Sequence, residues 1–126
     1  MRLTSNAEIA FEEWYTNNYH ADPNDYNFVP IQGKRDGQWN THIEVTFYML
    51  TAAQKFAVYI DFADSLSKRK DIICRLCILI IETQKGFAYT INGTRSDTFP
   101  TRPEARLAAI NNLDTLLNQI FPLILS

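Results

Sequence analysis

The sequence is poor in the residues that build catalytic and cofactor sites. Its 126 residues include only four glycines, two histidines and two cysteines. There is no nucleophile-elbow, phosphate-loop or dinucleotide motif, and four glycines leave little room for a glycine-rich loop. The histidines, His20 and His42, lie in separate polar settings without a motif around them. From these absences we expect a protein that is not an enzyme and that uses no metal or cofactor.

Long apolar runs and a strong excess of one charge are also absent. The longest near-apolar run, Ile72–Ile81, contains Arg75 and has about half the length that a bilayer-spanning helix requires. The first residues contain no apolar segment that resembles a signal peptide. A net charge of −2 gives no bulk attraction to nucleic acid or to an anionic membrane. We therefore expect a soluble cytoplasmic protein without a membrane partner.

The two cysteines, Cys74 and Cys77, have the Cys-x-x-Cys spacing of redox and zinc motifs. Those motifs need a turn or helix start that brings the sulfurs together. On a strand, however, residues three apart point to opposite faces, so these sulfurs diverge. No second Cys or His pair lies nearby to complete a zinc site. We expect both cysteines to be free thiols buried in the core.

The residues that are present predict a single domain over 1–126. A chain of this length, 46% hydrophobic, buries roughly two-thirds of its unfolded surface and can form a core without disulfides or metals. Capping boxes, in which a hydroxyl residue and Glu or Gln three positions later bond each other's backbone donors, predict three helix starts. These pairs are Ser5 with Glu8, Thr51 with Gln54, and Thr101 with Glu104.

The first predicted helix runs to about Asn18 and includes Trp14 as a core residue. The second, up to about Leu66, also shows strand-like alternation, but its cap, alanines and length favour a helix. The third ends at Pro122 and turns Asn118 and its polar neighbours toward water.

A β-hairpin over residues 72–92 is the predicted centre of the fold. Ile72–Ile81 and Phe87–Ile91 are its strands, joined by a turn that contains Gly86. The first strand is apolar on both faces, so we expect a cover on both. One face, with Cys77, Leu79 and Ile81, has no evident cover except the C-terminal tail or a partner.

A further strand is predicted near His42–Phe47, because Ile43, Val45 and Phe47 alternate with polar residues. It has a candidate edge partner near residues 28–32. Helices and an antiparallel hairpin together predict the α+β class, with three helices packed on a small antiparallel sheet.

Two segments resemble small uncharacterised proteins of phages and mobile elements of gut bacteria. The first is Phe47-Tyr48-x-Leu50 with Gln54 and Val58-Tyr59-x-Asp61-Phe62-x-Asp64-Ser65, and the second is Thr101–Arg106 with Ala109-Ile110. An N-terminal helix with a Trp-Tyr pair, here Trp14-Tyr15, adds to the resemblance. The resemblance implies an accessory protein that acts in the cytoplasm of a bacterial host, and it brings no activity and no site residue.

We therefore expect a non-enzymatic protein that binds an unknown host or phage protein. The apolar C-terminal tail is the candidate interface and implies a homodimer if it is one. Its candidate residues are Phe121, Leu123, Ile124 and Leu125.

The alternative is a nucleic-acid-binding module. A helix, strands and a capped helix are similar to the double-stranded-RNA-binding arrangement, in which a basic helix start contacts phosphate. Against it, the last helix lacks a lysine cluster and the chain is net acidic. The candidate contacts are Lys68, Arg69, Lys70, Arg102 and Arg106.

Overall fold

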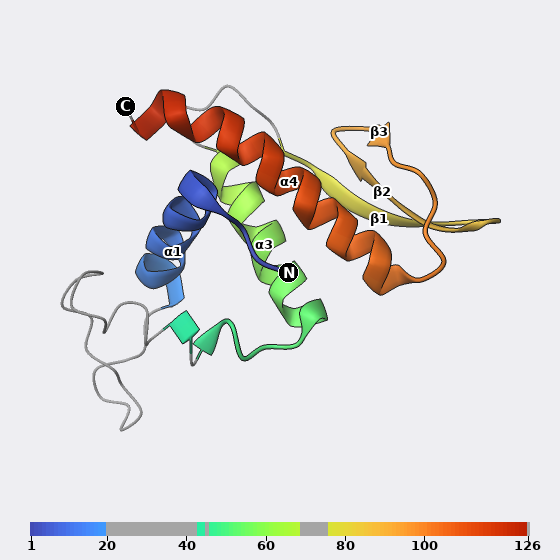
Figure 1. Cartoon of the computed structure of the whole chain (residues 1–126), viewed down its shortest axis with the longest axis horizontal. Coiled ribbons are helices and arrows are strands. Elements are labelled where there is room, and N and C mark those ends of the chain that lie inside the picture. Colours follow the sequence, from blue (N-terminus) through green and yellow to red (C-terminus); the bar gives the residue numbers. More distant parts are fainter. Residues whose placement is uncertain (20–42, 45, 69–75, 126) are drawn as a thin grey trace.

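The structure, a computed structural model, describes residues 1–19, 43–44, 46–68 and 76–125 (Figure 1). Its elements are α1 (Ser5–Tyr19), α3 (Ala52–Ser67), β1 (Ile78–Thr83), β2 (Gly86–Ile91), β3 (Thr94–Arg95) and α4 (Arg102–Leu125). The three strands form an antiparallel sheet in the order β1-β2-β3. The predicted α+β class, with three helices on a small antiparallel sheet, is confirmed. None of the described helices has the length and apolar character that crossing a membrane requires.

Helices α3 and α4 begin where their capping residues predict. The Thr51 hydroxyl accepts a hydrogen bond from the Gln54 amide (3.2 Å), and the Gln54 side chain accepts one from the Thr51 amide (3.0 Å). At α4, Thr101 accepts from the Glu104 amide (3.3 Å) and donates its hydroxyl proton to the Glu104 carboxylate (3.2 Å). The predicted helix over the ambiguous second segment is therefore confirmed, and it buries Tyr59, Phe62, Ala63 and Leu66 on one stripe.

The start of α1 is held by side chains of α4 and not by the predicted box of Ser5 and Glu8. Asp114 accepts from the Thr4 amide (2.8 Å) and from the Thr4 hydroxyl (2.7 Å), and Asn118 accepts from the Ala7 amide (2.9 Å). Glu8 instead bonds Arg2 at 2.9 Å. The expectation that Asn118 faces water was wrong, because its amide satisfies a backbone donor in the first turn of another helix.

The predicted hairpin is confirmed from Ile78 onward, whereas its residues 72–75 lie outside the described part. Ile80 pairs with Tyr89 in its register, and Gln84-Lys85 forms the turn. Gly86 follows the turn with φ of 137°, a conformation that L side chains rarely adopt. Phe99 closes the other side of β2 through two backbone hydrogen bonds with Phe87, of 2.6 and 2.8 Å.

The predicted strand at His42–Phe47 was wrong. Ile43, Glu44 and Thr46 are helical, and the amide of Phe47 donates to the carbonyl of Ile43 at 2.8 Å. Ile43 and Phe47 are both fully buried, and a four-residue spacing places both on one side of a helical turn. The candidate partner strand near 28–32 lies outside the described residues.

The core lies where α4 crosses α1 and α3. Figure 1 shows α4 along the length of the molecule, with its first half over the sheet and its second half beside the other helices. The Phe11 ring lies 4.8 Å from Phe47 and 4.7 Å from Tyr59 between centroids. Trp14, which was expected in the core, is partly buried and packs against the core, with its ring 5.3 Å from that of Phe62 between centroids.

The helix α4 continues past Pro122 to Leu125, so the predicted end at Pro122 was wrong. A proline near the end of a helix removes one backbone bond, to the residue four positions earlier, and the following amides can still bond. Phe121, the residue before it, is 1% exposed and belongs to the core.

Candidate functional site

The five basic residues predicted for nucleic-acid contact do not form one patch among the described residues. Arg102 lies over the Phe87 ring (5.1 Å to the centroid), and Arg106 lies over Phe56 near the start of α3 (5.9 Å). Lys68 caps the other end of α3, twelve residues after Phe56, which is roughly 18 Å along a helix. The structure therefore keeps Lys68 away from the two arginines. Arg69 and Lys70 lie outside the described part.

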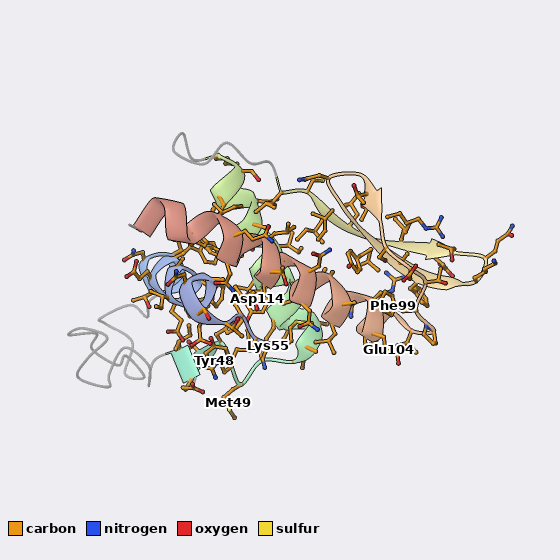
Figure 2. The ribbon with its side chains drawn as sticks, turned by 45° about the horizontal axis from the view of Figure 1, so that its top comes forward. Tyr48, Met49, Lys55, Phe99, Glu104 and Asp114 are labelled. Carbon is orange, nitrogen blue, oxygen red and sulfur yellow. The ribbon has the colours of Figure 1, made fainter. Side chains whose placement is uncertain are left out.

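The hairpin tip brings together two other cations. Lys85 in the turn and Arg95 on β3 line an open pocket of about 360 Å³ with Thr83 and Gln84. Lys85 was not among the predicted contacts, because only the folded hairpin shows which residues lie beside its turn. Exposed Glu82 on β1 is close in sequence to Lys85, and exposed Glu104 in the first turn of α4 lies between Arg102 and Arg106. Figure 2 shows Glu104 and Phe99 at this same end of α4.

The predicted tail interface lies partly inside the molecule. Phe121 is a core residue of the single chain, so its ring is not available to a partner while the core is packed. The side chains of Leu123, Ile124 and Leu125 lie outside the described part. The tail does not cover the outer face of the sheet, since α4 packs on the opposite face and ends at the far side of the molecule (Figure 1).

The described fold leaves part of that outer face exposed along β1, whereas Ala88, which pairs with Ile81 on the same face, is buried. Residues 77, 79, 81 and 83 alternate on the outer face, opposite the face where the Tyr89 hydroxyl accepts a hydrogen bond from Asn112 of α4. Leu79 is 56% exposed, although leucine on a sheet is normally covered. Cys77 is exposed as well, so its expected burial was wrong. Cys74 lies outside the described residues.

The strand β1 also lies at the edge of the sheet. The Asn92 amide donates to the Cys77 carbonyl at 2.9 Å, so odd-numbered residues of β1 face β2 with their backbone groups. The backbone groups of Ile78, Ile80 and Glu82 therefore point away from β2. Just before them, the amide of Leu76 points the same way and donates to the Ser67 hydroxyl at 2.9 Å. No such partner is found for Ile78–Glu82 in the part of the chain that the structure describes.

A second group of polar side chains joins the N-terminal segment to the helices. The Arg2 guanidinium bonds Glu8, lies 3.6 Å from a Glu44 oxygen and stacks on the Tyr48 ring at 4.1 Å. The Tyr48 hydroxyl donates to Glu12 at 3.4 Å. In Figure 2, Tyr48 and the 78% exposed Met49 lie in the segment before α3, near Lys55.

Burial shapes the electrostatics of this second group. Desolvation and the neighbouring Glu8 raise the pKa of Glu12, and the hydrogen bond to Glu8 raises the pKa of Arg2. Burial likewise raises the pKa of Tyr48 above its ordinary value. The group links α1, the segment at 43–48 and the N-terminus, which is a structural role. Among the described residues, no three His, Cys, Asp or Glu side chains gather closely enough to hold a metal ion.

No family model, curated protein or solved structure matches this chain.

Proposed function

We propose that this chain is a non-enzymatic accessory protein of a phage or mobile element, which binds a partner protein in the cytoplasm of its bacterial host. One observation carries the proposal. The edge strand β1 combines outward backbone groups at Ile78, Ile80 and Glu82 with an outer face on which Leu79 is 56% exposed. Exposed apolar edge strands are templates for pairing with another chain.

The composition of β1 strengthens this proposal. Proteins protect sheet edges with lysine, proline, bulges or very short strands. The strand has no proline and no charge before Glu82, and its pairing with β2 proceeds without a bulge over six residues. A strand of this kind is prone to pair with another chain, which supports a binding role. The phage or mobile-element setting comes from the sequence resemblance alone.

A pull-down tests this function. The tagged chain is expressed in cells that carry the phage or element, and the captured proteins are identified by mass spectrometry. We expect at least one protein that is captured by the wild type and lost with Leu79→Lys, because a charge on the outer face opposes apolar contact. Met49→Lys is the matched control, because Met49 is also exposed but lies before α3. A capture pattern that is identical for the two variants would contradict the proposal.

The second candidate function is nucleic-acid binding, and the order of the elements supports it. The succession α3-β1-β2-β3-α4 is the element order of the double-stranded-RNA-binding arrangement, although among the described helices it is α4 that packs on the strands. Lys85, Arg95, Arg102 and Arg106 are the described cations nearest to the hairpin and the start of α4. Net charge and nearby carboxylates weigh against strong phosphate contact.

A gel-shift titration with double-stranded RNA at several salt concentrations separates the two functions. If nucleic acid is the ligand, the affinity falls steeply with salt and falls further in Arg102→Gln with Arg106→Gln, while Lys55→Gln leaves it unchanged. Binding that does not depend on salt, or no binding at low salt, excludes the second function.

A further inference from the structure

We propose that the partner strand of β1 is β1 of a second copy, in antiparallel pairing around a two-fold axis at Ile80. This inference rests on the proposed function: it assigns the edge of β1 to a second copy and leaves the outer face around Leu79 for the partner protein. A two-fold contact is self-complementary, so each residue of the strand must suit the residue that the two-fold axis places opposite it. The register of the hairpin allows this condition to be examined residue by residue.

The free edge has a defined length. Ile78, Ile80 and Glu82 have backbone groups that point away from β2, as the bond between Cys77 and Asn92 fixes. Before this stretch, Ser67 of α3 occupies the amide of Leu76. After it, Gln84 and Lys85 turn the chain into β2. The edge therefore offers a short strand that is bounded at both ends.

An axis at Ile80 uses this strand fully. It pairs Ile80 with Ile80 of the second copy. Ile78 of each copy then pairs with Glu82 of the other. A shift of the axis toward Leu79 pairs Glu82 with Leu76, whose amide Ser67 already occupies. A shift toward Ile81 pairs Ile78 with Gln84 in the turn. The Ile80 register is therefore the one that leaves none of the outward groups unpaired.

The side chains agree with the same register. Leu79 of each copy lies opposite Ile81 of the other, in a non-hydrogen-bonded pair where side chains approach most closely. The two Glu82 carboxylates each face an isoleucine, so like charges are not opposed. The outer face of one sheet thereby continues into that of the other, and the exposed Leu79 gains an apolar neighbour.

Disulfide trapping tests the register in the full chain. In this pairing Cys77 lies opposite Thr83 of the second copy, whereas within one chain they lie at opposite ends of the exposed strand. In a Cys74→Ser background, Thr83→Cys should give a covalent dimer under mild oxidation, and adding Cys77→Ser should abolish it. Thr94→Cys, on the opposite edge of the sheet, is the matched control and should stay monomeric on a denaturing gel. Equal trapping at positions 83 and 94 would overturn the inference.

Sedimentation equilibrium of the untagged chain gives the second measurement. We expect a reversible dimer whose dissociation constant rises roughly tenfold or more in Leu79→Lys, because two symmetric cross-strand pairs are lost. Circular dichroism checks that the variant is folded. A wild-type chain that remains monomeric, while its pull-down partner still depends on position 79, overturns the homotypic pairing and leaves the proposed function standing.

Discussion

At the scale of single residues, Asp114 and Asn118 show how two helices far apart in sequence share one cap. The first turn of a helix leaves backbone donors without internal partners. In α1 these donors reach across to α4, where the Asn118 side-chain amide also donates to Asp114 at 3.0 Å and so holds it in place. The contact fixes the direction in which the N-terminal segment enters the core, where Leu3 and Ala7 are buried.

Asp114→Ala should therefore lower the free energy of unfolding by about 1–2 kcal/mol, the usual cost of losing a helix N-cap. Urea unfolding followed by circular dichroism measures the change. Asp64→Ala is the matched control, because Asp64 is exposed on α3, and its effect should stay within about 0.5 kcal/mol. Equal losses in the two variants would show that the cap from α4 does not stabilise α1.

Glu12 gives a prediction on pH dependence. Burial and the neighbouring Glu8 raise its pKa in the folded state above the ordinary value of 4.5, whereas Arg2 and the Tyr48 hydroxyl oppose the rise. The folded state then binds the proton more tightly than the unfolded state. The free energy of unfolding must fall as pH rises from the unfolded pKa through the folded pKa.

Glu12→Gln should remove this fall, so the stability of the variant relative to wild type should increase as pH rises above the ordinary glutamate pKa of 4.5. Urea unfolding at several pH values checks the sign, and the exposed Asp64→Asn serves as the carboxylate control. A stability difference between Glu12→Gln and wild type that is constant with pH, or that shrinks as pH rises, would contradict the raised pKa.

At the scale of elements, the hairpin depends on Gly86. A Cβ at this position would collide with the backbone carbonyl oxygen of Phe99, and φ of 137° is itself unfavourable for other residues. Gly93 also has a positive φ, of 85°, but a Cβ there would meet open space. Substitution of Gly93 therefore measures the free-energy cost of the backbone conformation alone, and substitution of Gly86 measures that cost together with the cost of the steric clash.

Gly93→Ala should cost about 1 kcal/mol for conformation alone, and Gly86→Ala should cost roughly 3 kcal/mol or more, because the bridge between Phe87 and Phe99 must also shift. Thermal or urea unfolding of both variants gives the comparison. If Gly86→Ala is no more destabilising than Gly93→Ala, the segment at Phe99 does not pack against the turn as described.

The sequence was sufficient to predict those elements whose caps or turns are formed by residues only a few positions apart. Thr51 with Gln54, Thr101 with Glu104 and the turn before Gly86 each contain their own structural cause. The segment at Ile43–Phe47 was mispredicted because a six-residue window fits both alternation and a four-residue helical spacing. The hydrogen bond from the Phe47 amide to the Ile43 carbonyl decides between them, and the sequence does not reveal it.

The candidate site was less accessible from sequence, because it depends on distance and register. In the sequence, Lys68 and Arg106 are both basic residues next to predicted strands. In the structure they lie at opposite ends of α3. The apolar outer face around Leu79 was expected from alternation, and its lack of cover by the tail follows from the path of α4. The outward set of backbone groups follows from one hydrogen bond, between Cys77 and Asn92, which the sequence does not reveal.

At the scale of the whole molecule, the two faces of the sheet differ in how far their apolar side chains are buried. Three helices and one face of the sheet enclose a core rich in aromatic rings, whereas Cys77 and Leu79 are exposed on the other face and β1 lies at the edge of the sheet. A sheet covered on one side only normally presents polar residues on the other. Leu79, Ile81 and Cys77 depart from that pattern on the strand that also has a free edge.

The central claim is that another chain pairs with the outward backbone groups of β1. Amide hydrogen exchange along β1, followed by NMR at low and high protein concentration, tests this claim most directly. At low concentration the amides of Leu79 and Ile81, bonded to β2, should exchange slowly, and those of Ile78, Ile80 and Glu82 should exchange fast. At high concentration the outward set should become protected as the second copy covers it. An Ile80 amide that exchanges fast at every concentration, and in the presence of any captured partner, would contradict the account.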